Sequence, residues 1–141
     1  MKKPRFILPV TLALSLMPTT LSVPALADDS MVSFAMPSGN ISCRFIPQSE
    51  GEGASAGLEL PTLSCEREKQ SPARIILGPS GKGAIYKDIS DPFCCDGDTT
   101  VGYGQTWENG PFKCVSAEDG LTCRRRDGHG FFISRAKLLA Y

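Results

Sequence analysis

Short hydrophobic or alternating runs recur along the chain from Met31 onward, and turn sequences separate them. The connecting sequences, such as PSGN, GPSGKG, ENGP and AEDG, combine glycine with Asn, Asp, Pro or Ser, which favour positive φ angles and local hydrogen bonds. Runs of this length and spacing are typical of an all-β sandwich or barrel. We expect strands at Met31–Met36, Asn40–Ile46, Leu58–Glu66, Ala73–Gly78, Ala84–Asp88, Thr99–Glu108, Phe112–Ser116, Leu121–Arg126 and Gly130–Arg135.

The hydrophobic pattern predicts almost no α-helix. No stretch before the C-terminus sustains the 3.6-residue apolar period of an amphipathic helix. The closing residues SRAKLLAY are compatible with one or two helical turns. The expected fold is therefore a small, disulfide-stapled antiparallel sandwich or barrel with a short helical turn at its C-terminus.

The first 27 residues have the organisation of a secretory signal peptide. Three basic residues occur within the first five, an apolar run extends from Phe6 to Val23, and ALA at 25–27 is a small-x-small cleavage sequence. A membrane anchor is the alternative, but Pro9 and Pro18 interrupt the run and no second apolar segment follows. We expect residues 28–141 to form a single domain that is secreted or periplasmic and has no membrane anchor after cleavage.

Charge and cysteine usage narrow the classes of partner. Removing the leader takes away three basic and no acidic residues, so the formal charge falls from zero to about minus three, which disfavours nucleic-acid binding. An even number of cysteines in a small exported domain indicates disulfides. A structural zinc site is the alternative, but paired C-x-x-C sequences and closely spaced histidines are missing. We expect no metal and no cofactor. The six cysteines are Cys43, Cys65, Cys94, Cys95, Cys114 and Cys123.

Spacing suggests part of the disulfide pattern, although six cysteines allow fifteen pairings. Asp119-Gly120 is a hairpin turn between two runs that each bear a cysteine, which favours a Cys114–Cys123 bridge. Cys43 and Cys65 lie in two consecutive strand candidates and form the second expected pair. Cys94 and Cys95 stay open: they bridge each other, or one of them takes a partner from another pair.

His129 is the one histidine and the main candidate for catalysis. As a general base it would need an orienting group, such as Asp127, and a nucleophile, such as Ser116 or Ser134. No spacing rule links these residues. We favour a turn histidine that hydrogen-bonds the backbone between two glycines, and we predict no catalytic residue.

A binding surface is a second possibility. Arg124 and Arg126 would share one strand face, and Arg135 could extend it into a site for an anion, a glycan acid or an acidic partner. The alternative is a soluble edge strand protected by charge. Tyr103 and Trp107 would share a face of another strand, where aromatic rings stack on a sugar or partner, or belong to the core. With His129, these are the candidate surface residues.

Several sequence pieces together resemble a family of small exported bacterial domains of unknown function. The pieces are FAMPSGNISC (Phe34–Cys43), LSCE (Leu63–Glu66), GDT (Gly97–Thr99), GYGQTW (Gly102–Trp107), GPFKCVS (Gly110–Ser116) and GLTCRRRDGHGFFISR (Gly120–Arg135). The resemblance implies a disulfide-bonded, mostly β secreted domain and supplies no catalytic residues. Relatives tend to have a cysteine between the SCE and GDT pieces, whereas here Cys94 directly precedes Cys95.

The sequence therefore favours a non-enzymatic binding or interaction module whose partner is an envelope or extracellular protein or a glycan. One alternative is an envelope-polymer hydrolase that uses His129. Another is a protein like the small β-barrel inhibitors of lysozyme, through the similarity of SGKGAIY (Ser80–Tyr86). A passive structural part of an envelope assembly is the third.

Overall fold

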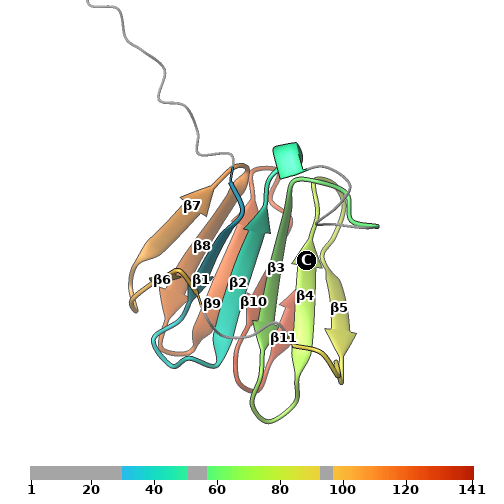
Figure 1. Ribbon diagram of the computed structural model, residues 1–141. Helices are drawn as coiled ribbons and strands as arrows, with labels where there is room; N and C mark the ends of the chain where they lie inside the picture. The colour runs from blue at the N-terminus through green and yellow to red at the C-terminus, as the bar shows by residue number, and fades with distance from the viewer. Residues whose placement is uncertain (1–29, 51–56, 93–96) are drawn as a thin grey trace, which may run out of the picture.

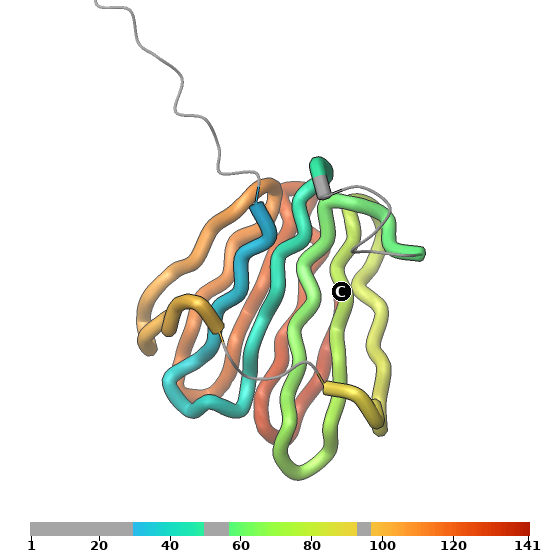
Figure 2. Tube along the Cα trace, in the orientation of Figure 1, coloured from blue at the N-terminus to red at the C-terminus, as the bar shows by residue number. Residues whose placement is uncertain are grey.

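The computed structural model describes residues 30–50, 57–92 and 97–141, and in these residues the chain forms two packed β-sheets. Figure 1 shows the sheets one in front of the other, and the Cα trace in Figure 2 shows that neighbouring strands are joined mainly by short turns. Each sheet is open, with two edges, so the architecture is a sandwich and not a barrel. The expected leader at residues 1–27 lies outside the described residues, as do Cys94 and Cys95.

The six-stranded sheet has the order β5-β4-β3-β2-β1-β6. All its neighbours are antiparallel except β1 and β6, which are parallel. A 3-10 turn, η1 (Gln48–Glu50), follows β2. The strands are β1 (Val32–Ala35), β2 (Ile41–Ile46), β3 (Thr62–Arg67), β4 (Ala73–Leu77), β5 (Ala84–Lys87) and β6 (Thr99–Thr100).

The five-stranded sheet is an antiparallel meander of order β11-β10-β9-β8-β7. Each strand pairs with the one before it because the connections are tight turns, such as the Asp119-Gly120 turn between β8 and β9. Its strands are β7 (Thr106–Asn109), β8 (Phe112–Ala117), β9 (Gly120–Arg125), β10 (Gly130–Ile133) and β11 (Leu138–Ala140).

The all-β prediction is confirmed, with two corrections. The expected C-terminal helical turn is wrong, because residues 138–140 pair with β10 as strand β11. The expected strand Thr99–Glu108 is two strands, β6 and β7, separated by a turn at residues 102–105.

The two residues that precede the short strand β6, Gly97 and Asp98, make close contacts with β1. The Asp98 carboxylate accepts hydrogen bonds from the backbone N–H and the hydroxyl of Ser33, at 3.1 and 2.7 Å. These bonds, from the hydroxyl first, lower the pKa of Asp98. At Gly97 a Cβ atom would lie 2.4 Å from the Ala35 nitrogen, so only glycine allows this approach to β1.

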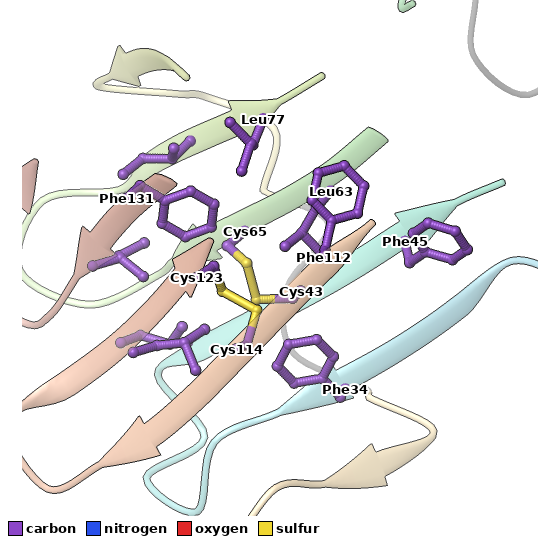
Figure 3. Close-up of a cluster of buried hydrophobic side chains, with 14 of the residues drawn as sticks. Phe34, Cys43, Phe45, Leu63, Cys65, Leu77, Phe112, Cys114, Cys123 and Phe131 are labelled. Atoms are coloured by element: carbon purple, nitrogen blue, oxygen red, sulfur yellow. A yellow bond between two sulfur atoms is a disulfide. The ribbon is translucent and has the colours of Figure 1, made fainter. Parts of the chain in front are cut away.

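Both expected disulfides are present at the centre of the core. Cys43–Cys65 joins β2 to β3, and Cys114–Cys123 joins β8 to β9; in each the cysteines are directly opposite and their Cα atoms are 4.0 Å apart. All four cysteines are fully buried in one cluster, where Figure 3 shows them among phenylalanine and leucine side chains from both sheets. Each bridge therefore fastens one sheet internally, and hydrophobic packing joins the two sheets.

Candidate functional site

A hollow of about 320 Å³ lies at one end of the sandwich, where four connections meet. The connections are the β1–β2 turn, the turn before β7, the β8–β9 turn and the β10–β11 turn. The β1–β2 turn marks this end of the molecule, the lower end in Figure 1. The hollow is lined by Met36, Ser38, Asn40, Ile41, Tyr103, Glu118, Asp119, Gly120, Ser134, Arg135 and Ala136.

The hollow combines an apolar base with charged and hydroxyl groups. Met36 and Ile41 belong to the buried core and are 4% and 3% exposed, while Tyr103 is an exposed aromatic side chain. Glu118, Asp119 and Arg135 are exposed. The three charged side chains have no ion-pair or hydrogen-bond partner within the described ranges. They are therefore available to a bound molecule.

Asn40 is the most distinctive polar residue of the hollow, because the residue is mostly buried while its amide nitrogen stays accessible and has no acceptor in the described part of the chain. It is 5% exposed, and its Oδ1 accepts a hydrogen bond from the Lys69 backbone N–H at 2.7 Å. This bond fixes the orientation of the amide, since a backbone N–H must meet the oxygen and not the nitrogen. Its Nδ2 has no acceptor among residues 30–50, 57–92 and 97–141. The nitrogen is not among the fully buried side-chain atoms of this part of the chain that lack a partner, so it is open to solvent or to a ligand.

Arg67 supports one wall of the hollow from behind. Its guanidinium donates to the Ser134 and Arg135 carbonyl oxygens at 3.0 and 3.1 Å, and to the Ser71 carbonyl at 2.8 Å. Arg67 is 6% exposed, so these bonds are shielded from water. The β10–β11 turn, which carries Arg135, is thereby fixed to the β3–β4 turn of the other sheet.

Tyr103 stands on a tight turn and not on a strand. Gln105 Oε1 accepts from the Gly102 N–H at 2.7 Å, and Gly104 N–H donates to the Ser116 carbonyl at 2.7 Å. These bonds fold residues 102–105 back on themselves and present Tyr103 to the hollow. The expectation that Tyr103 and Trp107 share a strand face is therefore wrong.

Trp107 lies mainly in the core, the alternative that the sequence left open. Its ring centroid is 4.5 Å from that of Phe34 and 6.2 Å from that of Phe45. Phe34 and Phe45 belong to the six-stranded sheet and Trp107 to the five-stranded sheet, so Trp107 helps to join the two sheets. It is not one of the lining residues of the hollow.

The three consecutive arginines of the β9–β10 region have different environments. Arg124 is exposed on the outer face of the five-stranded sheet, with its guanidinium 5.4 Å from the centre of the Tyr141 ring, and Arg126 is also exposed. Arg125 is buried and points inward. It donates to the carbonyl oxygens of Gly78 and Gly81, at 2.6 and 2.8 Å, in the β4–β5 turn. Arg125 therefore connects the two sheets.

His129 hydrogen-bonds the backbone, as the favoured reading of the sequence expects. The ring Nδ1 of His129 lies 3.2 Å from the Tyr141 carbonyl oxygen. The backbone N–H of His129 donates to Asp127 Oδ1 at 3.2 Å. Asp127 also accepts from the Arg125 guanidinium, and these bonds, that from Arg125 first, lower the pKa of Asp127. Its carboxylate contacts the histidine backbone and not the ring.

Neither candidate nucleophile stands next to His129. Ser116 faces the core and is fully buried, and its hydroxyl has no partner within the described part of the chain. Ser134 lies at the other end of β10, five residues from His129 and therefore about 17 Å along the strand at roughly 3.4 Å per residue. The geometry therefore assembles no nucleophile–base pair from these residues.

The candidate surface residues thus separate into two groups. Tyr103 and Arg135 line the hollow, whereas Arg124, Arg126 and His129 belong to the opposite end of the sandwich. Asn40, Glu118 and Asp119 were missed as site residues. The only signals for them were the turn sequences PSGN and AEDG, which identify turns but not the partners that those turns meet.

The described residues show neither a metal cluster nor a membrane span. No three His, Cys, Asp or Glu side chains in this part of the chain gather closely enough to hold a metal ion. Among the same residues there is no helix with the length and apolar character needed to cross a bilayer.

Comparison with known proteins places part of the chain in a family of unknown function. No curated protein and no solved structure matches the chain. Residues 85–141 match the model of a family of unknown function (DUF6636). The matched segment contains the whole five-stranded sheet, strand β6 and all of strand β5 except Ala84. The resemblance to a family of small disulfide-bonded domains of unknown function is thus confirmed by the match of residues 85–141 to this family.

Proposed function

We propose that this protein is a non-enzymatic binding module that acts in the periplasm or outside the cell and holds its ligand in the hollow at the turn end. The observation that carries the proposal is the Asn40 side chain in the hollow, whose oxygen is held by the Lys69 N–H and whose accessible amide nitrogen has no acceptor among the described residues. A ligand atom in the hollow would satisfy it, and the neighbouring unpaired charges would orient the ligand.

Hydrogen bonds hold the turns that line the hollow in place, and such a preorganised site favours binding. Arg67 fixes the β10–β11 turn, Lys69 fixes Asn40, and Gln105 fixes the turn that carries Tyr103. A preorganised site loses less conformational entropy when its ligand arrives. The two buried disulfides support the compartment, because such bridges persist in oxidising environments.

The separation of His129 from Ser116 and Ser134 supports a non-enzymatic role over hydrolysis. General-base catalysis requires the base and its proton donor to be within hydrogen-bond reach, directly or through one water. The ring of His129 lies beside the Tyr141 carbonyl, at the end of the sandwich away from the hollow.

A binding assay with matched arginine variants tests the proposal. The oxidised protein is mixed with a filtered small-molecule extract of bacterial cell envelope, and bound compounds are identified by native mass spectrometry. We expect Arg135→Ser to reduce capture and Arg124→Ser, which changes another exposed arginine at the other end, to leave it unchanged. Captured compounds should be recovered chemically intact. Equal loss in both variants, or conversion of a captured compound, would contradict the proposal.

A further inference from the structure

We infer that the hollow takes a neutral saccharide of one or two rings, an inference that rests on the proposed binding function. The juxtaposition that supports it is an exposed aromatic ring, an apolar base, and hydrogen-bond donors and acceptors that are unpaired among the described residues, all within one hollow. Each of these features matches a property of sugar rings.

The polar groups of the hollow offer both kinds of hydrogen bond. The carboxylates of Glu118 and Asp119 accept only, the Arg135 guanidinium donates only, and Asn40 Nδ2 has two N–H groups to donate. A sugar hydroxyl can donate and accept at once, so neighbouring hydroxyls can satisfy both kinds of group. Hydrogen bonds to the charged groups are the stronger ones, which favours specific orientation.

The apolar surface suits the C–H face of a sugar ring. Tyr103 is 43% exposed although it lines the hollow, so much of its ring is open to solvent or to a ligand. Met36 and Ile41 form a base without polar side-chain groups other than a thioether. Burial of a ligand face against these side chains would add hydrophobic stabilisation.

The charges argue against other classes of small ligand. Two carboxylates and one guanidinium give the lining a net negative charge, which would repel phosphates, nucleotides and acidic sugars. A divalent cation would meet the Asn40 N–H groups and the Arg135 guanidinium, which repel it. An apolar lipid chain would remove water from the charged groups without replacing its hydrogen bonds.

The volume limits the size of the ligand. About 320 Å³ lies at the lower end of the range for small-molecule sites, roughly 300–1,000 Å³. The hollow therefore accommodates a monosaccharide or disaccharide unit, and a longer glycan would have to continue outside it.

Titration with defined sugars tests the inference. Maltose, cellobiose and N,N′-diacetylchitobiose are added separately, at millimolar concentrations, to the oxidised ¹⁵N-labelled protein, with glucuronate, inorganic phosphate and glycine as comparison probes. We expect at least one neutral disaccharide to give saturable amide shifts at residues 36–41, 102–105, 118–120 and 134–136. The anions are expected to give none there.

Two variants and a control identify the groups that bind. Asn40→Asp replaces the amide nitrogen with an acceptor while keeping the oxygen that binds Lys69, and it should weaken sugar binding about tenfold. Tyr103→Ala should weaken it roughly 2- to 10-fold. Tyr86→Ala is the control, because Tyr86 is 50% exposed on edge strand β5 and is not part of the hollow. If Asn40→Asp does not fold, the Tyr103 and Tyr86 pair decides the question.

The outcomes separate this inference from the proposed function. Shifts at the hollow with glycine or phosphate but with no sugar would overturn the saccharide assignment and leave a binding site in place. Sugar binding that both Asn40→Asp and Tyr103→Ala leave unchanged would overturn it as well. Captured envelope compounds that shift only amides outside the hollow would overturn the proposed function itself.

Discussion

Arg125 fastens the five-stranded sheet to the β4–β5 turn, and Arg125→Met is expected to destabilise the protein by about 2–4 kcal/mol. The side chain is only 3% exposed, and its guanidinium reaches the carbonyl oxygens of Gly78 and Gly81. Methionine keeps much of the apolar stem but removes every donor. The loss should therefore come from hydrogen bonds and not from a cavity.

The size of the expected loss in the free energy of unfolding depends on how exposed each hydrogen-bond partner of Arg125 is. A hydrogen bond from a charged donor contributes about 1.5–3 kcal/mol. Gly78 is half-buried, so its carbonyl would lose most of that contribution, whereas Gly81 is exposed and water can replace the guanidinium there. The Asp127 side chain is 49% exposed, so its ion pair with Arg125 adds little. For a domain of this size the loss lowers the Tm by roughly 10–20 °C.

Urea unfolding followed by tryptophan fluorescence measures the effect. Trp107 is the chain's single tryptophan and packs on Phe34 across the sheets, so its emission reports separation of the sandwich. Arg124→Met is the matched control, since this neighbouring arginine is exposed and should cost under about 1 kcal/mol. Equal destabilisation by the two substitutions, or a loss below about 0.5 kcal/mol for Arg125→Met, would refute the reasoning.

Three other changes test separate contacts of the fold. Replacing both Cys114 and Cys123 by alanine should lower the free energy of unfolding by about 2–3 kcal/mol, measured by urea titration, because the bridge closes a short loop. Gly97→Ala should cost about 1–3 kcal/mol in the same assay, since its Cβ would meet the β1 backbone. Gly78→Ala should cost less, because its Cβ would make only ordinary contacts, at 3.9 Å. Asp127 has a lowered pKa, so its contribution to stability is present above its unfolded pKa of about 3.9 and is lost as the pH falls through the folded pKa. Asp127→Asn should therefore reduce the fall of the urea midpoint in acid. An unchanged fall of the midpoint would contradict this.

Alternation along the chain predicted most of the fold because each strand buries one side. In β8, for example, Phe112, Cys114 and Ser116 are buried while Lys113 and Val115 are exposed. The same period explains why Arg124 and Arg126 face solvent and the arginine between them does not. The turn sequences then fixed the meander of the second sheet, and with it the Cys114–Cys123 register.

The wrong prediction of a C-terminal helical turn has a tertiary origin. The closing sequence contains Ala, Lys and Leu, which favour helix, but pairing of Leu138–Ala140 with β10 overrides that local preference. Strand β3 also departs from simple alternation, since all six of its residues are buried, including the fully buried Glu66, which pairs with Arg74. Burial of a polar outer face depends on what covers it, and periodicity carries no such information.

The candidate site was the least predictable feature. Its residues come from four turns that are distant in sequence, and local signals identify each turn without showing that they converge. Tyr103 and Arg135 were selected for their chemistry, but Asn40 resembled an ordinary turn residue. Its role becomes visible only when burial and the bond from Lys69 are known together.

The central claim is that each sheet carries its own buried cross-strand bridge, and disulfide mapping under non-reducing conditions tests it most directly. Trypsin cuts after Arg44, between the cysteines of the first bridge, and a protease specific for acidic residues cuts at Glu118 or Asp119, within the loop of the second. The account predicts linked peptides for Cys43–Cys65 and for Cys114–Cys123. A bridge from Cys43 or Cys65 to Cys114 or Cys123, or free thiols at these positions in protein isolated without reductant, would contradict it.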